Sequence, residues 1–358
     1  MIIFRGFKPF FCGKIKLLLW VLAFGLFQKA GFSQTIQQVG REINNKVSFR
    51  GLSVVNDSIA LVSGSQATIL KTKDGGKLWQ KIEIPDCDKC DFRTCFAFDS
   101  SRFLVANAGS PARIFLTNNG GQNWNLVYSN MDKEAFLDGM DFWDENVGVC
   151  FGDPINGKML ILLTMDRGKS WLPMANSPIL EVGEASFAAS GTTISCQPNG
   201  SLWIATGGTK SRLWLTEDTG RTWKFVSVPI LQGKSSQGIF SFGFSGKKRL
   251  IVVGGDYLAD SLRRDHIYHS DDFGKTWNFP KMPTRGYREC ICFINPSTWI
   301  AVGPSGLDIS RNDGENWESG TFDVSGFHVI RKARKGSLVL MAGGKGKVAK
   351  VSGLQRFK

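Results

Sequence analysis

Short apolar runs, rich in β-branched and aromatic residues, alternate along the chain with turns that contain Gly, Asn, Asp and Ser. The first unit shows the pattern, with three runs at residues 50–55, 59–63 and 67–71 and a fourth at residues 79–84 after a tight turn. Runs of this length between turn residues predict β-strands, and no stretch has the period of an amphipathic helix. Four consecutive strands of this kind predict an antiparallel meander, which is one blade of a β-propeller.

The turn before the fourth strand carries a repeated motif, Ser/Thr-x-Asp-x-Gly-x-x-Trp, and residues 216–223 are one copy of it. Six copies begin 45, 47, 52, 54 and 40 residues apart, with Asn in place of Asp at Asn119 and Asn312. A unit that recurs at this spacing indicates a repeat architecture. The copies begin at Thr72, Thr117, Thr164, Thr216, Ser270 and Ser310.

Each position of the motif has a physical role in a tight turn. The glycine, Gly220 in the fourth copy, allows a positive φ. The Asp or Asn accepts backbone N–H groups across the turn, and the Trp packs a large ring under the hairpin. We therefore expect Asp218 and its counterparts to build turns and to have no metal-binding or catalytic role.

Glycines that mark the second corner of each unit occur seven times, although the motif occurs six times. The seventh unit has strands at 327–330, 337–341 and 347–351 and then ends, whereas residues 35–39 resemble residues 79–82. We expect this N-terminal strand to complete the last blade and so remove an open sheet edge. The predicted fold is all-β, a single seven-bladed propeller of four-stranded antiparallel blades spanning residues 34–358.

The first 33 residues have the organisation of a secretory signal peptide. Basic residues precede an apolar run at 17–27, and small residues stand at Gly31 and Ser33. The run is too short to span a bilayer comfortably, and Cys12 precedes it, which argues against a lipoprotein. We expect cleavage near Ser33, an exported protein in the periplasm or outside the cell, and no transmembrane segment after cleavage.

Charge and cysteine content narrow the partners. The formal net charge is +13, of which residues 1–33 supply five, so the rest carries +8, concentrated near the C-terminus. Such a surface can attract anionic polysaccharide or lipid head groups, but a solvated basic face without a partner is the simpler interpretation. Export makes nucleic acid the least expected partner. Cys87 and Cys90 have no matching second pair and the chain has three histidines, so we expect no metal site and no cofactor. Their pairing after export stays open.

The innermost strands of a propeller line its central channel. Aligning the units places one polar residue at the start of each such strand, which predicts a site for an anionic or sugar-like ligand at the channel mouth. The alternative is that these groups satisfy one another as a salt-bridged plug without a ligand. The candidate residues, with one neighbour, are Arg50, Arg93, Asp138, Glu184, Gln237, Tyr287, Arg288 and His328.

The repeated motif resembles the Asp-box, also called the bacterial neuraminidase (BNR) repeat. Over nearly the whole chain after the leader, the sequence resembles the photosystem II stability/assembly-factor-like propellers, which are exported and have seven blades. That resemblance implies a non-enzymatic module that binds a ligand or a protein of a membrane complex. The Asp-box itself is specific for a fold and poor evidence for an activity.

A more distant resemblance is to sialidases, which bind a substrate carboxylate with three arginines and use a Tyr nucleophile. It would assign the arginines to Arg50, Arg93 and Arg288 and the nucleophile to Tyr287 or Tyr257, with Asp138 and Glu184 as the carboxylates. Sialidase propellers have six blades, and their Phe/Tyr-Arg-Ile-Pro motif is absent here. A carbohydrate-active hydrolase or lyase is therefore the alternative function, and no catalytic residue is assigned.

Overall fold

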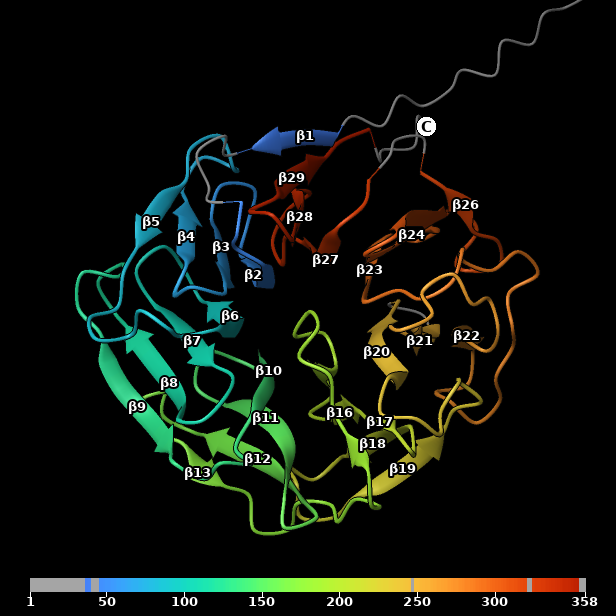
Figure 1. Cartoon of the computed structure of the whole chain (residues 1–358), viewed down its shortest axis with the longest axis horizontal. Helices are drawn as coiled ribbons and strands as arrows, with labels where there is room; N and C mark the ends of the chain where they lie inside the picture. Colours follow the sequence, from blue (N-terminus) through green and yellow to red (C-terminus); the bar gives the residue numbers. More distant parts are fainter. Residues whose placement is uncertain (1–35, 40–44, 246–247, 321–323, 354–358) are drawn as a thin grey trace, which may run out of the picture. The chain divides into compact units, whose positions relative to one another are not determined.

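The computed structural model describes residues 36–39, 45–245, 248–320 and 324–353, which form seven antiparallel sheets in a ring (Figure 1). These residues contain no helix, and therefore none that is long and apolar enough to cross a membrane. The fold is the expected all-β propeller with seven blades. The expected signal peptide and residue 35 lie outside the described residues.

The first three blades follow the predicted meander, with each strand paired to the next along the chain. Blade 1 is β2 (Phe49–Val54), β3 (Ala60–Gly64), β4 (Ile69–Thr72) and β5 (Gln80–Ile82); blade 2 is β6 (Phe92–Ala97), β7 (Phe103–Asn107), β8 (Ala112–Thr117) and β9 (Asn125–Asn130); blade 3 is β10 (Leu137–Phe142), β11 (Gly148–Ile155), β12 (Lys158–Thr164) and β13 (Leu172–Pro173).

Blades 4 to 7 keep this order with two local differences. Blade 4 is β15 (Ile194–Cys196), β16 (Leu202–Ala205), β18 (Arg212–Thr216) and β19 (Lys224–Ser227); blade 5 is β20 (Gln237–Phe244), β21 (Leu250–Asp256), β22 (Ile267–Ser270) and an outer segment bridged at Asn278; blade 6 is β23 (Cys290–Asn295), β24 (Thr298–Gly303), β25 (Gly306–Ser310) and β26 (Glu318–Ser319); blade 7 is β27 (Phe327–Lys332), β28 (Val339–Gly343), β29 (Val348–Val351) and β1 (Ile36–Val39). Two short strands, β14 (Glu184–Ala185) and β17 (Gly207–Gly208), extend blade 5 inward.

The N-terminal strand closes the ring, as the sequence predicts. Strand β1 pairs antiparallel with β29, from Ile36 opposite Val351 to Val39 opposite Val348. The last blade therefore combines three C-terminal strands with one N-terminal strand, and the outer edge of β29 is covered.

The hydrophobic core lies between neighbouring blades. In one such cluster, Ile251 and Val253 of blade 5 pack against Ile291 and Trp299 of blade 6, and each is nearly or fully buried. Such β-branched and aromatic side chains face one another across adjacent sheets because their strands alternate inward and outward residues.

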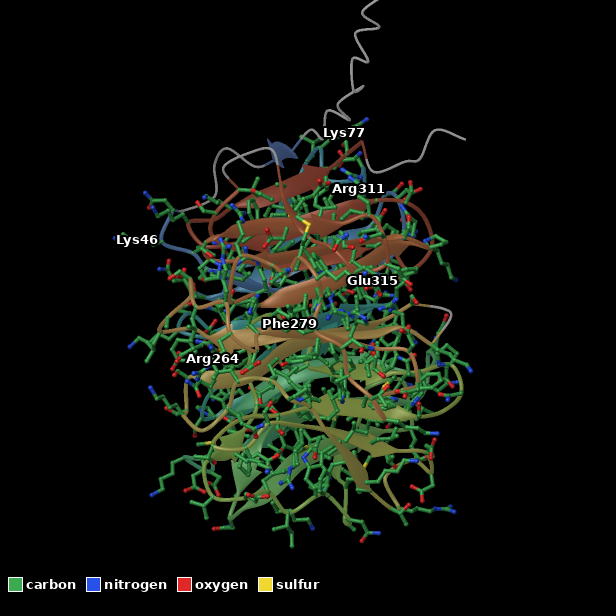
Figure 2. The ribbon with its side chains drawn as sticks, turned by 90° about the vertical axis from the view of Figure 1, so that its right-hand side faces the viewer. Lys46, Lys77, Arg264, Phe279, Arg311 and Glu315 are labelled. Carbon is green, nitrogen blue, oxygen red and sulfur yellow. A yellow bond between two sulfur atoms is a disulfide. The ribbon has the colours of Figure 1, made fainter. Side chains whose placement is uncertain are left out.

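The repeated motif forms a tight turn that is closed by its own side chains. The Thr216 hydroxyl accepts the N–H of Gly220 at 2.9 Å, and the Asp218 carboxylate accepts the N–H of Thr222 at 2.9 Å. Gly220 has a φ of 85°, which favours glycine. Seen edge-on, the motif residues Lys77, Arg311 and Glu315 lie toward one face of the ring and Lys46 and Arg264 toward the other (Figure 2).

The segment of residues 186–193, here called the channel segment, lies in the middle of the ring (Figure 1). Its backbone accepts hydrogen bonds from Arg50 of blade 1, at Ala189 O (3.0 Å), and from Arg331 of blade 7, at Gly191 O (2.8 Å). Its Ser190 hydroxyl donates to the carbonyl of Glu289 in blade 6 at 2.9 Å. The segment therefore fills the central channel and connects blades that are distant in sequence.

Candidate functional site

A cavity of about 430 Å³ opens at the end of the ring where the innermost strands begin. The channel segment lines it through Ser186, Phe187, Ala188 and Ala189. Charged and aromatic side chains make up most of the wall: Arg50, Arg93, Asp138, Asp153, Glu289, His328, Phe136, Phe240, Tyr257 and Tyr287. We call this space the mouth cavity.

In five blades, a β-bulge places one residue of the innermost strand at the mouth cavity. Within the described chain, five innermost strands have one extra residue near their start, where the pairing with the second strand shifts. A bulge of this kind re-aims the side chain of the extra residue. The five extra residues all line the cavity: Arg50, Arg93, Asp138, Phe240 and His328.

Glu289 connects three of the polar side chains around the cavity. Its carboxylate is 2.5 Å from His328 Nδ1 and 3.7 Å from Arg50, and it accepts the Tyr287 hydroxyl at 3.2 Å. Burial, and then the nearby Glu289 charge, raise the pKa of Tyr287 well above its usual range. Tyr287 therefore keeps its proton and acts as a hydrogen-bond donor.

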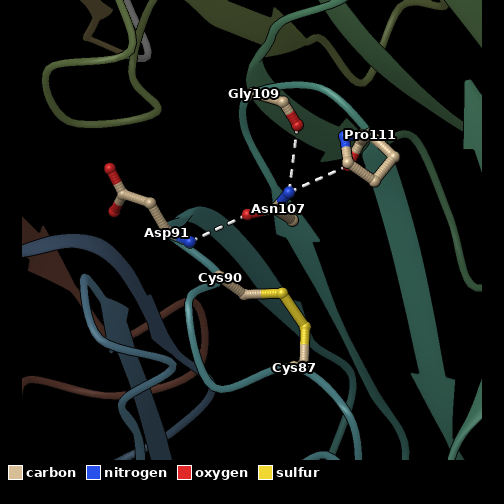
Figure 3. Close-up of a disulfide and its surroundings, with 6 residues drawn as sticks. All are labelled: Cys87, Cys90, Asp91, Asn107, Gly109 and Pro111. Atoms are coloured by element: carbon tan, nitrogen blue, oxygen red, sulfur yellow. Dashed lines mark hydrogen bonds between the residues drawn. A yellow bond between two sulfur atoms is a disulfide. The ribbon is translucent and has the colours of Figure 1, made fainter. Parts of the chain in front are cut away.

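Arg93 is held on the opposite side by the loop that precedes its strand. Its Nε donates to Asp91 at 2.7 Å, and the guanidinium lies 5.5 Å from the ring centre of Phe136. The backbone N–H of Asp91 donates in turn to Asn107 at 2.8 Å, next to the disulfide between Cys87 and Cys90 (Figure 3). The other cysteines of the described residues, Cys95, Cys150, Cys196, Cys290 and Cys292, are free thiols.

Asp138 and Asp153 form the acidic part of the wall. Asp138 is fully buried, and neither of its carboxylate oxygens has a hydrogen-bond partner among the described residues. Burial, and then the charge of Asp153, raise the pKa of Asp138 well above its usual range against an opposing effect of Arg93. Burial also raises the pKa of Asp153, although its carboxylate accepts the N–H of Ser186 at 3.1 Å.

The structure places five of the eight candidate residues in the mouth cavity: Arg50, Arg93, Asp138, Tyr287 and His328. The other three bind partners elsewhere. Glu184 forms an ion pair with Arg212 and accepts the Thr206 hydroxyl at 2.6 Å. Gln237 donates to Asp256 at 3.0 Å. Their partners are not candidate residues, so these two side chains neither line the cavity nor pair with the rest of the predicted ring.

Arg288 does not line the mouth cavity, although the alignment of the units predicted it there. It is fully buried, its Nε donates to Asp308 at 2.8 Å, and its Nη2 forms a second bond to the same carboxylate. Its neighbour Glu289 lines the cavity instead. Consecutive residues of an extended chain point in opposite directions, so an alignment that is wrong by one residue exchanges the two.

The alignment of the repeats was wrong in blades 4 and 5, where it placed Glu184 and Gln237 at the start of the innermost strand facing the mouth cavity. The innermost strand of blade 4 begins at Ile194, ten residues after Glu184, because the channel segment is inserted between them. In blade 5 the bulge residue is Phe240, three positions after Gln237. Phe187 of the channel segment stacks on Phe240 with ring centres 3.7 Å apart. The interval of 52 residues between the motif copies at Thr164 and Thr216 exceeds the two before it, but the following interval of 54 is longer still, so the spacing alone did not locate the insertion.

No group of three or more His, Cys, Asp and Glu side chains in the described part of the chain is placed to hold a metal ion. The cavity instead combines two arginines, a carboxyl pair and aromatic rings. This composition suits an organic ligand with polar ends, since pockets of about 300–1,000 Å³ with a few placed polar groups bind such ligands.

The fold and the motif turns define the protein as a seven-bladed propeller in which six blades carry a repeated Asp/Asn turn before their outermost strand. A family model described as "Photosynthesis system II assembly factor YCF48" matches residues 32–133. The photosystem II stability/assembly factor of Arabidopsis thaliana is 22% identical over 277 residues, which cover 71% of this chain and 62% of that protein. The chain thus spans about three-fifths of the length of that relative.

Two further comparisons agree with this match. The photosystem II assembly lipoprotein YCF48 of Synechococcus sp. (strain CC9902) is 23% identical over 270 residues, 75% of this chain and 74% of that protein. A solved structure described as YCF48 bound to D1 peptide superposes with a TM-score of 0.65 at 17% identity, covering 88% of this chain and 96% of the other. The resemblance to photosystem II assembly-factor-like propellers is confirmed.

Proposed function

We propose that the protein is an exported assembly module that holds a segment of a client protein in the mouth cavity. The observation that carries the proposal is the cavity itself, which Arg50 and Arg93 line from bulges of two innermost strands, together with residues of the channel segment. A guanidinium can bind a carboxylate through two parallel hydrogen bonds, so an anionic group of the client is the expected anchor. Phe187, Phe240 and Tyr257 offer apolar surface beside it.

The comparisons support a peptide as the ligand class. The similar solved propeller is a YCF48 protein bound to a D1 peptide. A cavity of about 430 Å³ can also hold a chain end or a few side chains of a short loop. We infer a location in the periplasm or outside the cell from the leader at residues 1–33, with the propeller at 34–358 as the exported domain.

The alternative of a sialidase-like hydrolase has less support from the site. A clamp of three arginines would need Arg288, which is buried against Asp308. The Tyr287 hydroxyl donates to Glu289, and its raised pKa opposes the ionisation that a nucleophile needs. We therefore favour binding over hydrolysis.

The test is a binding screen of the purified full chain against an array of random peptides and an array of glycans. Peptides selected in this way are titrated against the wild type and against Arg50→Gln and Arg93→Gln by fluorescence anisotropy. We expect each variant to weaken binding about tenfold to a hundredfold, the effect of losing a hydrogen bond to a charged group. Arg50→Lys restores only part of the affinity, because an ammonium lacks the forked geometry.

Arg264→Gln is the matched control, since Arg264 lies on the same face of the ring (Figure 2) with a largely exposed side chain and does not line the cavity. It should change affinity less than about twofold, as expected for a screened surface charge. Peptide binding that ignores both cavity variants contradicts the proposal. Selective binding of glycans, with hydrolysis of an aryl-glycoside, would favour the hydrolase.

A further inference from the structure

We propose that Asp138 and Asp153 form a subsite for a primary ammonium group of the client, either a lysine side chain or a free N-terminus. The inference rests on the proposed function, in which the mouth cavity holds a client segment. It adds a second anchor of opposite charge to the anionic anchor at Arg50 and Arg93, and it predicts a client segment with both charges.

Asp138 is the first observation. Its side chain lines the cavity at the bulge of β10, yet it is fully buried and both carboxylate oxygens are without a hydrogen-bond partner among the described residues. A buried polar group without a partner costs free energy, and a buried charge costs more. A ligand that donates hydrogen bonds to this carboxylate removes that cost on binding.

Asp153 is the second observation. It lines the same cavity from β11, the strand paired with β10, and its Oδ1 accepts one bond from the N–H of Ser186 at 3.1 Å. Arg93 on β6, whose charge acts on Asp138, already donates to Asp91 at 2.7 Å. The two carboxyls therefore present more acceptor oxygens than the surrounding protein supplies donors.

A primary ammonium fits this arrangement better than other cations. It brings three donors and a positive charge that offsets the repulsion between the two carboxylates. The rings of Phe136 and Phe187 also line the cavity, and aromatic faces attract an ammonium. A metal ion is a poorer fit, because within the described residues no third His, Cys, Asp or Glu completes a coordinating group.

The subsite gives ligand binding a defined pH dependence. The groups that face Asp138 are Asp153 and the Cys150 thiol on β11 and Arg93 on β6. In the free protein the pKa of Asp138 is raised, whereas a bound ammonium favours the ionised carboxylate. Affinity for a peptide with an ammonium group therefore increases as the pH rises from acid to neutral.

The experiment begins with random peptides displayed with free N-termini and selected on the full-length wild type, Asp138→Asn and Asp153→Asn. Asp132→Asn is the control, because Asp132 is exposed and is not part of the cavity wall. A wild-type binder is then synthesised in two further forms, one with each lysine replaced by norleucine and one with an acetylated N-terminus. Affinities are measured by anisotropy, with a melting curve for every variant.

We expect removal of the correct ammonium to lower wild-type affinity about tenfold to a hundredfold, with little effect on the affinity of Asp138→Asn. The norleucine and acetylated forms show whether the ammonium belongs to a lysine or to the N-terminus. Asp132→Asn should behave as the wild type. If Asp138→Asn does not fold, Asp153→Asn provides the same comparison.

Two results would overturn the inference, and they are distinguishable from each other. Binders that require Arg50 but tolerate the loss of every ammonium would reject the subsite and leave the proposed function intact. A wild-type protein that selects no peptide, or whose binders ignore Arg50→Gln, would reject both.

Discussion

Two aspartates, one on each face of the ring, have opposite environments. Asp218, in a motif turn, accepts hydrogen bonds from the hydroxyl and the N–H of Thr222, at 2.6 and 2.9 Å, and these lower the pKa of Asp218 to about 2. Asp138, in the mouth cavity, has no hydrogen-bond partner in the described chain, and its pKa is raised. The same type of side chain therefore closes a turn at one face and is buried without a hydrogen-bond partner at the other.

The two regions also differ in how far along the sequence their contacts reach. Within a motif turn the donor and acceptor lie two to four residues apart, as between Thr216 and Gly220. Around the mouth cavity, Arg50 donates to Ala189, a partner 139 residues away. Each motif turn can therefore form from its own residues, whereas the mouth cavity forms only when distant blades come together in the closed ring.

The largest effect is expected for Arg288→Ala, which removes one long-range contact beside the mouth. Asp308 would stay buried with Arg285 as its remaining arginine partner, and we expect a loss of about 3 kcal/mol in the free energy of unfolding. Urea unfolding measures this loss. Binding by the folded fraction should be unchanged, since Arg288 points away from the cavity.

Arg285→Ala is the matched control, because Arg285 bonds to the same carboxylate but its side chain is partly exposed. It should destabilise the protein clearly less than Arg288→Ala. If both variants lose the same free energy of unfolding, burial of the arginine does not determine how much its ion pair with Asp308 stabilises the protein. Lost binding with unchanged stability would restore Arg288 to the site.

The sequence predicts the blades and the turns because both depend on local patterns. Period-two apolar runs, the glycine of each turn and its neighbouring Asp or Asn all act within about ten residues, and the pairing of β1 with β29 follows from counting strands. The same reasoning assigns Arg50, Arg93, Asp138 and His328 to the start of innermost strands, where bulges place them.

The remaining features depend on contacts that a sequence pattern does not contain. Whether Arg288 or Glu289 faces the cavity depends on the strand register, and a shift of one residue reverses the answer. The path of the channel segment depends on hydrogen bonds to Arg50, Glu289 and Arg331 from three other blades. Phe187 reaches the cavity because it lies on the channel segment, and Asp153 because β11 is long. Aligning the repeats with one another does not reveal either residue.

Asp138→Asn tests whether the carboxyl group in the mouth cavity lacks a stabilising partner in the free protein. Asparagine cannot ionise, so the variant avoids the cost of a buried charge, and its free energy of unfolding should be higher by about 2 kcal/mol at neutral pH. A group with a raised folded pKa stabilises the protein below its unfolded pKa of about 3.9, and this contribution is lost as the pH rises through the folded value. The advantage of the variant over the wild type should therefore grow from acid to neutral pH.

Thermal melts of both proteins across this pH range check that prediction. Asp132→Asn, an exposed aspartate that caps a turn at the mouth face, should give no such trend. A variant that is less stable than the wild type at neutral pH would show that Asp138 has a stabilising partner, and it would weaken the case for a ligand.

Thr216→Val should have a smaller effect, because it disturbs one local turn of six. It removes the hydroxyl that accepts the N–H of Gly220 at 2.9 Å and donates to Asp218 at 2.8 Å, while preserving shape. Since Thr216 is buried, we expect a loss of about 1 kcal/mol in the free energy of unfolding and no change in peptide affinity. A change in affinity at constant stability would give the turns a binding role.

Asp218→Asn should have the smallest effect, and its pH dependence makes it informative. Asparagine already occupies this position in two copies, where Asn119 accepts the N–H of Asn123 at 2.9 Å, so the turn geometry should persist. The wild type keeps a small advantage from its depressed pKa, which contributes stability above the unfolded value of about 3.9. That advantage disappears as the pH falls toward the folded value of about 2. Thermal midpoints of the two proteins should therefore converge over this interval, whereas Asn119→Asp should introduce a similar pH-dependent difference in a turn that lacks it. A gap between wild type and Asp218→Asn that stays constant with pH would show that the carboxylate charge does not stabilise the motif turn.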